Sequence, residues 1–125
     1  MRLEYHSTAE GVDIASAQAD LRHLADLVAG GGELSLESSA HPRHLRGVRV
    51  DEAQGGVAIG VEESSYLTIR GGAEGRSLLA ELLRDVANMD DGGHVHLEYV
   101  EGHEFLVPEN VPLIVNSPHG GMPRR

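Results

Sequence analysis

Two stretches of the chain carry apolar residues at the spacing of a helix. The first is predicted to span residues 17 to about 28, with Ser16 as its N-cap and the glycines at 30–32 as its stop signal. The second spans residues 74–89 and has a wide apolar stripe made of Leu78, Leu79, Leu82, Leu83 and Val86. A stripe of that width predicts that this helix lies across a sheet.

Several shorter stretches alternate polar and apolar residues, which is the period of a strand. They lie at residues 2–6, 33–38, 48–51, 57–61, 66–70, 94–100 and 112–116. The sequence Gln54-Gly55-Gly56 is a hairpin signal, so the middle of the chain is predicted to be an antiparallel meander.

This order of elements predicts an α+β fold with a mainly antiparallel sheet of about five to seven strands and two helices packed on one face. The length fits a single domain over residues 1–116, followed by a flexible C-terminal tail at 117–125. No internal repeat is apparent in the sequence. The second face of such a sheet is partly wet, so its polar residues are the first place to look for function.

Composition removes several classes of function. Ten basic residues against twenty acidic ones give a net charge of −10, which opposes nucleic-acid binding and favours a basic partner. There is no cysteine, so disulfides and thiolate chemistry are excluded. The N-terminus lacks a signal-peptide core and no apolar run could span a membrane, so the expected location is the cytoplasm.

The segment GGHVHLEYVEGHEFL at 92–106 is the richest in chemistry. As a strand, it would bury Val95, Leu97 and Tyr99 and expose His94, His96 and Glu98. Imidazoles two residues apart with a carboxylate can hold a metal ion, and a tight turn at 101–102 would bring His103 near as a further ligand. The alternatives are a solvated strand face or a partner surface, and acid–base chemistry by a histidine–glutamate pair.

Other signals for catalysis or cofactors are weak. His94 and His96 with Glu101 match part of the cupin motif, but two helices and too few strands argue against a cupin barrel. His41 and His44 in a turn-rich connector are more simply explained as loop residues than as metal ligands. The chain has no nucleophile elbow and no phosphate-binding glycine loop, so we expect no enzyme activity and no cofactor.

The C-terminal half resembles a known family. The segment Leu67-Thr68-Ile69-Arg70-Gly71, the leucine-rich helix, HVHLEY at 94–99, GHEFL at 102–106 and PLIV at 112–115 are similar to the small actinobacterial immunity proteins of the immunity protein 32 type. The resemblance covers about residues 66–116. It implies an α+β protein encoded beside a polymorphic toxin, which binds that toxin in the producing cell and blocks it.

The leading hypothesis is therefore a non-enzymatic protein that neutralises a cognate toxin by occlusion. Its predicted contact residues are His96, Glu98, Glu101, His103 and Glu104. The alternative is a small metal-binding protein or metalloenzyme that uses His94, His96, Glu98 and His103. A structural module that dimerises through its wet sheet face or an edge strand such as 112–116 is a third possibility.

Overall fold

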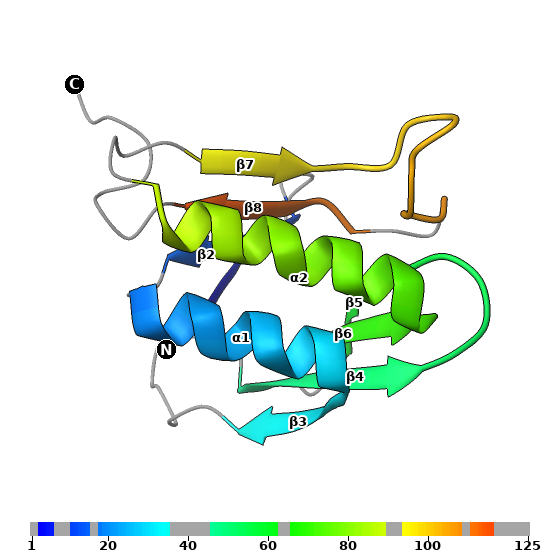
Figure 1. Ribbon diagram of the computed structural model, residues 1–125. Coiled ribbons are helices and arrows are strands. Elements are labelled where there is room, and N and C mark those ends of the chain that lie inside the picture. The colour runs from blue at the N-terminus through cyan, green and yellow to red at the C-terminus, as the bar shows by residue number, and fades with distance from the viewer. Residues whose placement is uncertain are drawn as a thin grey trace.

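The α+β fold is confirmed by the computed structural model, which describes residues 3–6, 11–15, 18–35, 46–62, 66–89, 94–108 and 111–116. Within these residues the chain forms two helices and eight strands, and Figure 1 shows both helices on the same side of the strands. The described elements are β1 (Leu3–His6), β2 (Gly11–Ala15), α1 (Gln18–Gly30), β3 (Gly32–Ser35), β4 (Gly47–Glu52), β5 (Ala58–Val61), β6 (Tyr66–Gly71), α2 (Ala73–Ala87), β7 (His94–Leu97) and β8 (Leu113–Asn116).

The strands form two sheets of four, where the sequence suggested one larger sheet. Sheet A has the order β1-β2-β8-β7 and sheet B has the order β3-β4-β6-β5. Each sheet consists of two antiparallel pairs joined at its centre by a parallel pair, β2 with β8 and β4 with β6. The strand predicted at 112–116 is confirmed as β8, but its predicted position at a sheet edge is wrong, because β8 lies between β2 and β7.

The predicted meander in the middle of the chain is confirmed for β5 and β6, which pair antiparallel, and wrong for β4, which pairs with β6 instead of β5. The loop after β4 crosses the end of β6 instead, where the N–H of Ala53 donates to the carbonyl of Gly71 and the N–H of Gly72 donates to the carbonyl of Gly55. These bonds direct β5 to the far edge of β6. Gly71 permits the crossing, because a Cβ there would lie 2.8 Å from the carbonyl oxygen of Gly56.

Strand β2 has no counterpart among the predicted elements, yet it is a central strand of sheet A. Its two described side chains, Val12 and Ile14, are fully buried. The pattern Val-x-Ile was the only signal, and five residues are too few for periodicity to be decisive. The predicted Ser16 cap, the connector with His41 and His44, and the tail at 117–125 lie outside the described residues.

The core lies between the helices and the sheets and consists of aliphatic side chains. The helices contribute their predicted stripes, with Leu21, Leu24 and Val28 of α1 and Leu79, Leu83 and Val86 of α2 buried to at least 99%. The helix α1 ends as predicted, because Gly31 has a φ of 82° and its N–H donates to the carbonyl of Leu27.

The two helices lie side by side and antiparallel. On their exposed side, a side-chain nitrogen of Arg84 lies 3.0 Å from a carboxylate oxygen of Asp26, and Arg22 donates to the side chain of Asn88 at 2.6 Å. Beneath these contacts, the buried Arg76 of α2 donates to the carbonyl oxygens of Val28 and Ala29, the last turn of α1, at 3.0 and 3.1 Å. A cation at that position stabilises a helix C-terminus.

Candidate functional site

The predicted two faces of the strand at 94–100 are confirmed. Exposure alternates along this stretch: His94, His96 and Glu98 are exposed, whereas Leu97 is only 5% exposed. The regular strand β7 ends at Leu97, three residues earlier than predicted, and lies at an edge of sheet A. His96 is therefore held on the solvent side of a short edge strand, opposite Ile114 of β8.

Beyond β7 the chain forms an exposed segment that we call the acidic loop, residues 98–104. Glu98, Glu101 and Glu104 are all exposed, and none of the hydrogen bonds or ion pairs described in the structure uses their carboxylates. Val100 lies among them and is 62% exposed, the one large hydrophobic side chain so exposed among the described residues. Figure 1 shows this part of the chain, in yellow to orange, running out past β7 and turning back.

A tight turn shapes the acidic loop, as the sequence predicted. The N–H of His103 donates to the carbonyl of Val100 at 2.9 Å, and Gly102 has a φ of 83°. Glycine is favoured at this position of a type II turn because other residues are strained at positive φ. The turn places Glu101 and Gly102 at the tip of the loop, where both are exposed.

His103 anchors the C-terminal end of the acidic loop. Its Nδ1 atom accepts hydrogen bonds from the backbone N–H groups of Phe105 and Leu106 at 3.1 and 3.0 Å. Unlike the neighbouring glutamates, its ring is partly buried. The histidine therefore acts within the protein first, by fixing the path of the chain that follows the loop.

The segment after the loop attaches to the outer edge of sheet B. Val57 donates to the carbonyl of Phe105 at 2.7 Å and accepts from the N–H of Val107 at 3.0 Å, and Val111 donates to the carbonyl of Ile59 at 2.8 Å. Gly56 allows this approach, because a Cβ there would lie 2.8 Å from the carbonyl oxygen of Phe105. The acidic loop is thus held at one end by sheet A and at the other by sheet B.

The candidate metal ligands do not converge. Among the described residues no group of three or more histidine and carboxylate side chains is placed to hold a metal ion. The Nδ1 lone pair of His103 already accepts two backbone hydrogen bonds, so only its Nε2 could reach a metal. The other pair considered, His41 and His44, lies outside the described residues.

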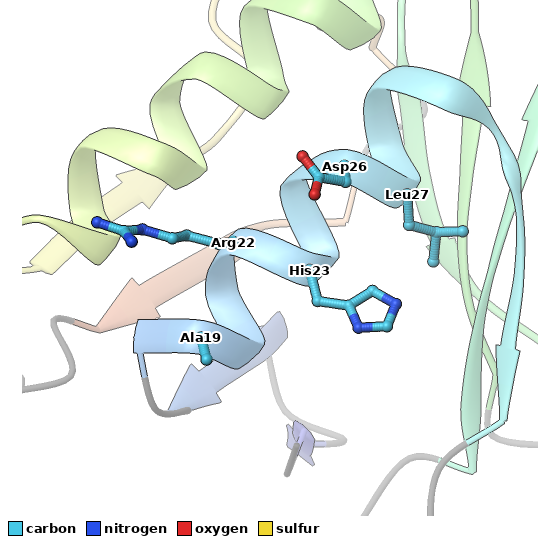
Figure 2. Close-up of a pocket in the computed structure, with 5 residues that line it drawn as sticks. All are labelled: Ala19, Arg22, His23, Asp26 and Leu27. Carbon is cyan, nitrogen blue, oxygen red and sulfur yellow. The ribbon is translucent and has the colours of Figure 1, made fainter.

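A shallow hollow on the exposed side of α1 does not bring its polar side chains together around a common point either. It is lined by Ala19, Arg22, His23, Asp26 and Leu27. Figure 2 shows the side chains of Arg22 and His23 pointing away from each other. Arg22 is already paired with Asn88, the residue that follows α2, and Asp26 is paired with Arg84 of α2.

The predicted contact residues occupy residues 96–104, with His96 on β7 and Glu98, Glu101, His103 and Glu104 in the acidic loop. Sequence reasoning missed Val100, which it could place only on the exposed face of a strand. It also missed Gly56 and Phe105, whose importance comes from contacts between segments far apart in the chain. No helix within the described part of the chain is long and apolar enough to cross a membrane.

Residues 66–118 match the family model of immunity protein 32. The match covers β6, α2, β7, the acidic loop and β8, and it confirms the resemblance seen in the sequence for this segment. No curated protein and no solved structure matches the chain significantly. The match points to an immunity function and to a toxin as partner.

Proposed function

We propose that this protein is a non-enzymatic immunity protein that binds a cognate toxin in the cytoplasm of the producing cell and blocks it by occlusion. The observation that carries the proposal is the acidic loop, an exposed and anchored segment inside the stretch that matches the immunity family. Its contact residues are His96, Glu98, Glu101 and Glu104, with His103 acting mainly as the anchor.

The charge of the loop supports a basic partner surface. Glu98, Glu101 and Glu104 are exposed within seven residues that contain neither arginine nor lysine. The net charge of −10 adds a long-range field of the same sign, which accelerates the encounter with a cationic protein. A toxin that acts on nucleic acid has a cationic active-site surface, so an acidic loop is well suited to cover it.

Val100 supplies an apolar contact at the centre of this charged surface. Interfaces commonly combine a small desolvated core with a polar rim, and the rim excludes water from the core. Here the exposed side chain of Val100 would form the core and the three glutamates the rim. Each side chain does little alone, but together they match a basic surface with a small apolar recess.

The anchoring of the loop matters for affinity. A loop that must become ordered on binding loses conformational entropy, whereas a preformed loop avoids most of that cost. The turn at Gly102, the bonds to His103 and the pairing of Phe105 and Val107 with Val57 fix the loop before any partner arrives. We therefore expect binding with little rearrangement of this segment.

Co-expression with the product of the neighbouring gene tests the proposal. The protein should protect cells from that product and should form a stable complex with it. Toxin released from the complex by denaturation and refolding should be fully active and chemically unchanged, because occlusion modifies nothing. Absence of both protection and complex, or recovery of a covalently altered toxin, would contradict the proposal.

A further inference from the structure

The two sheets are built on one pattern. Sheet A joins the pair β1–β2 to the pair β8–β7 through the parallel contact of β2 with β8, and sheet B joins β5–β6 to β4–β3 through the parallel contact of β6 with β4. Exchanging β1, β2, α1, β3 and β4 with β5, β6, α2, β7 and β8 converts each sheet into the other. Two subunits of a two-fold symmetric dimer are related in this way.

The strand registers agree residue by residue. Val12 lies opposite Leu113 in sheet A as Leu67 lies opposite Val48 in sheet B. The same agreement continues into the next strand, where Leu113 lies opposite Leu97 and Val48 lies opposite Leu34. A slip of one residue in either sheet would turn these side chains to the other face, so the agreement shows that the inner strands of both sheets bury the same face.

The sequence preserves the same correspondence. Leu24 to Val28 reads LADLV and Leu79 to Leu83 reads LAELL, and the spacing between these segments equals the spacing between Val12 and Leu67. Burial is the same at each apolar pair. These buried pairs are Val12 and Leu67, Ile14 and Ile69, Leu24 and Leu79, Ala25 and Ala80, and Val28 and Leu83.

We infer that residues 3–52 and 58–116 are two copies of one unit, an antiparallel strand pair followed by a helix and a second antiparallel strand pair, and that the surface along β6, α2 and β8 is a self-association surface that fits a second copy of the unit. In this chain the first copy occupies that surface. The match to immunity protein 32 covers only the second copy, whose inner strands β6 and β8 pair with β4 and β2 of the first. The acidic loop therefore depends on the first copy for its support.

One pair of equivalent positions shows that the copies have become specialised. The buried Arg76 of the second copy corresponds to Leu21 of the first, which is also buried. Arg76 donates to carbonyls that α1 leaves free by ending at Gly30. The residues of α2 equivalent to Val28 and Ala29 are Leu83 and Arg84, and α2 continues beyond both to Ala87. The carbonyl of Arg84 already accepts from the N–H of Asn88. If two second copies associated with each other, Arg76 would therefore meet poorer acceptors. Pairing of a second copy with a first copy is favoured.

A segment exchange in the full chain tests the equivalence. Residues 12–28 are replaced by the sequence of residues 67–83, with Leu21 retained. We expect a folded protein with dispersed amide resonances and cooperative urea unfolding. The matched control carries residues 66–82 at the same positions, again with Leu21 retained, and should lose the fold because every strand side chain changes face. Loss of the fold by the first variant as complete as in this control would overturn the inference.

Cleavage of the chain between the copies provides a second measurement. A protease site inserted between Gln54 and Gly55, both exposed, is cut after purification. The cut protein should keep the mass of the intact chain in sedimentation, and its unfolding midpoint should rise with protein concentration, since two fragments now associate. Separation of the fragments under conditions in which the intact chain is folded would overturn the shared-sheet arrangement.

Discussion

The ring of His103 stands edge-on to the ring of Phe105, with centroids 4.9 Å apart and planes at 89°, while its Nδ1 accepts the N–H of that same residue. Both contacts are local, yet they determine where the acidic loop ends and where the chain joins sheet B. A residue that the sequence marks as a metal ligand or a contact thus has a structural role first. Its removal should act on the loop rather than on a metal.

The anchor can be tested by His103→Ala. Two backbone N–H groups lose their acceptor, which should cost roughly 1–2 kcal/mol of stability. Hydrogen exchange at the amides of Phe105 and Leu106 should accelerate by at least about tenfold. Local opening costs less free energy in the variant because the hydrogen bonds to Nδ1 of His103 are absent. His94→Ala is the control, because His94 is exposed on β7 and should leave both amides protected. Unchanged exchange in His103→Ala would show that the loop is held by other contacts.

Close approach of the chain at Gly56 gives a second prediction. In Gly56→Ala the added Cβ would lie 2.8 Å from both the carbonyl oxygen of Phe105 and a methyl carbon of Val107, so the segment after the loop must move away from β5. We expect a loss of roughly 1–3 kcal/mol, as for other overpacked sites. Gly30→Ala, with no atom within 4 Å, should be neutral or slightly stabilising in urea unfolding. Equal stability of the two variants would contradict the described packing.

Two arginines allow the effect of a buried cation on stability to be compared with that of an exposed ion pair. Arg76→Met leaves the carbonyls of Val28 and Ala29 without their arginine donor and removes one of the two donors to the carbonyl of Gly71, which Ala53 still serves, and it should cost roughly 2–4 kcal/mol. Arg84→Met removes only the exposed pair with Asp26 and should cost at most about 1 kcal/mol. Urea unfolding at two salt concentrations distinguishes them, because only the second effect should diminish with added salt. A smaller loss for Arg76→Met than for Arg84→Met would be inconsistent with the buried network.

The internal symmetry predicts matched losses in the core. Leu24→Ala and Leu79→Ala occupy equivalent buried positions and should each cost roughly 2–5 kcal/mol. Because their surroundings correspond, the two values should agree within about 1 kcal/mol, which is tighter than the usual spread for this substitution. The exposed pair Asp26→Ala and Glu81→Ala should give small effects in both copies. Core losses that differ by several kcal/mol would count against equivalent packing.

The local elements of this fold follow from periodicity, but their pairing does not. The stripes around Leu24 and Leu79 predicted both helices, and alternation predicted the two faces of β7. The partners of β4 and β8 depend on long-range contacts, and the glycine signal at 54–56 suggested β5 instead of β6 as the neighbour of β4. The internal repeat is not apparent in the sequence because only LADLV and LAELL remain similar, whereas the other equivalent positions share burial rather than identity.

The candidate site was likewise predictable only where it depends on local sequence patterns. Glu98 and Glu101 are exposed in the structure as the strand pattern and the turn at Gly102 implied. The half-buried position of His103 was not predictable, because it follows from bonds to the N–H groups of Phe105 and Leu106, whose conformation the sequence does not specify. The exposure of Val100 indicates an apolar contact for a partner because the side chain lies in the same loop as the exposed carboxylates.

The acidic loop is the surface that we propose holds the toxin. The experiment that decides this is the affinity of the product of the neighbouring gene for the variant Glu98→Lys/Glu101→Lys/Glu104→Lys, measured beside Glu33→Lys/Glu81→Lys/Asp85→Lys. Both variants change three exposed carboxylates to amines, and only the first does so in the loop. We expect the loop variant to bind at least about a hundredfold more weakly and to lose protection of cells, while the control behaves as wild type. Equal affinity of the two variants would contradict the proposal.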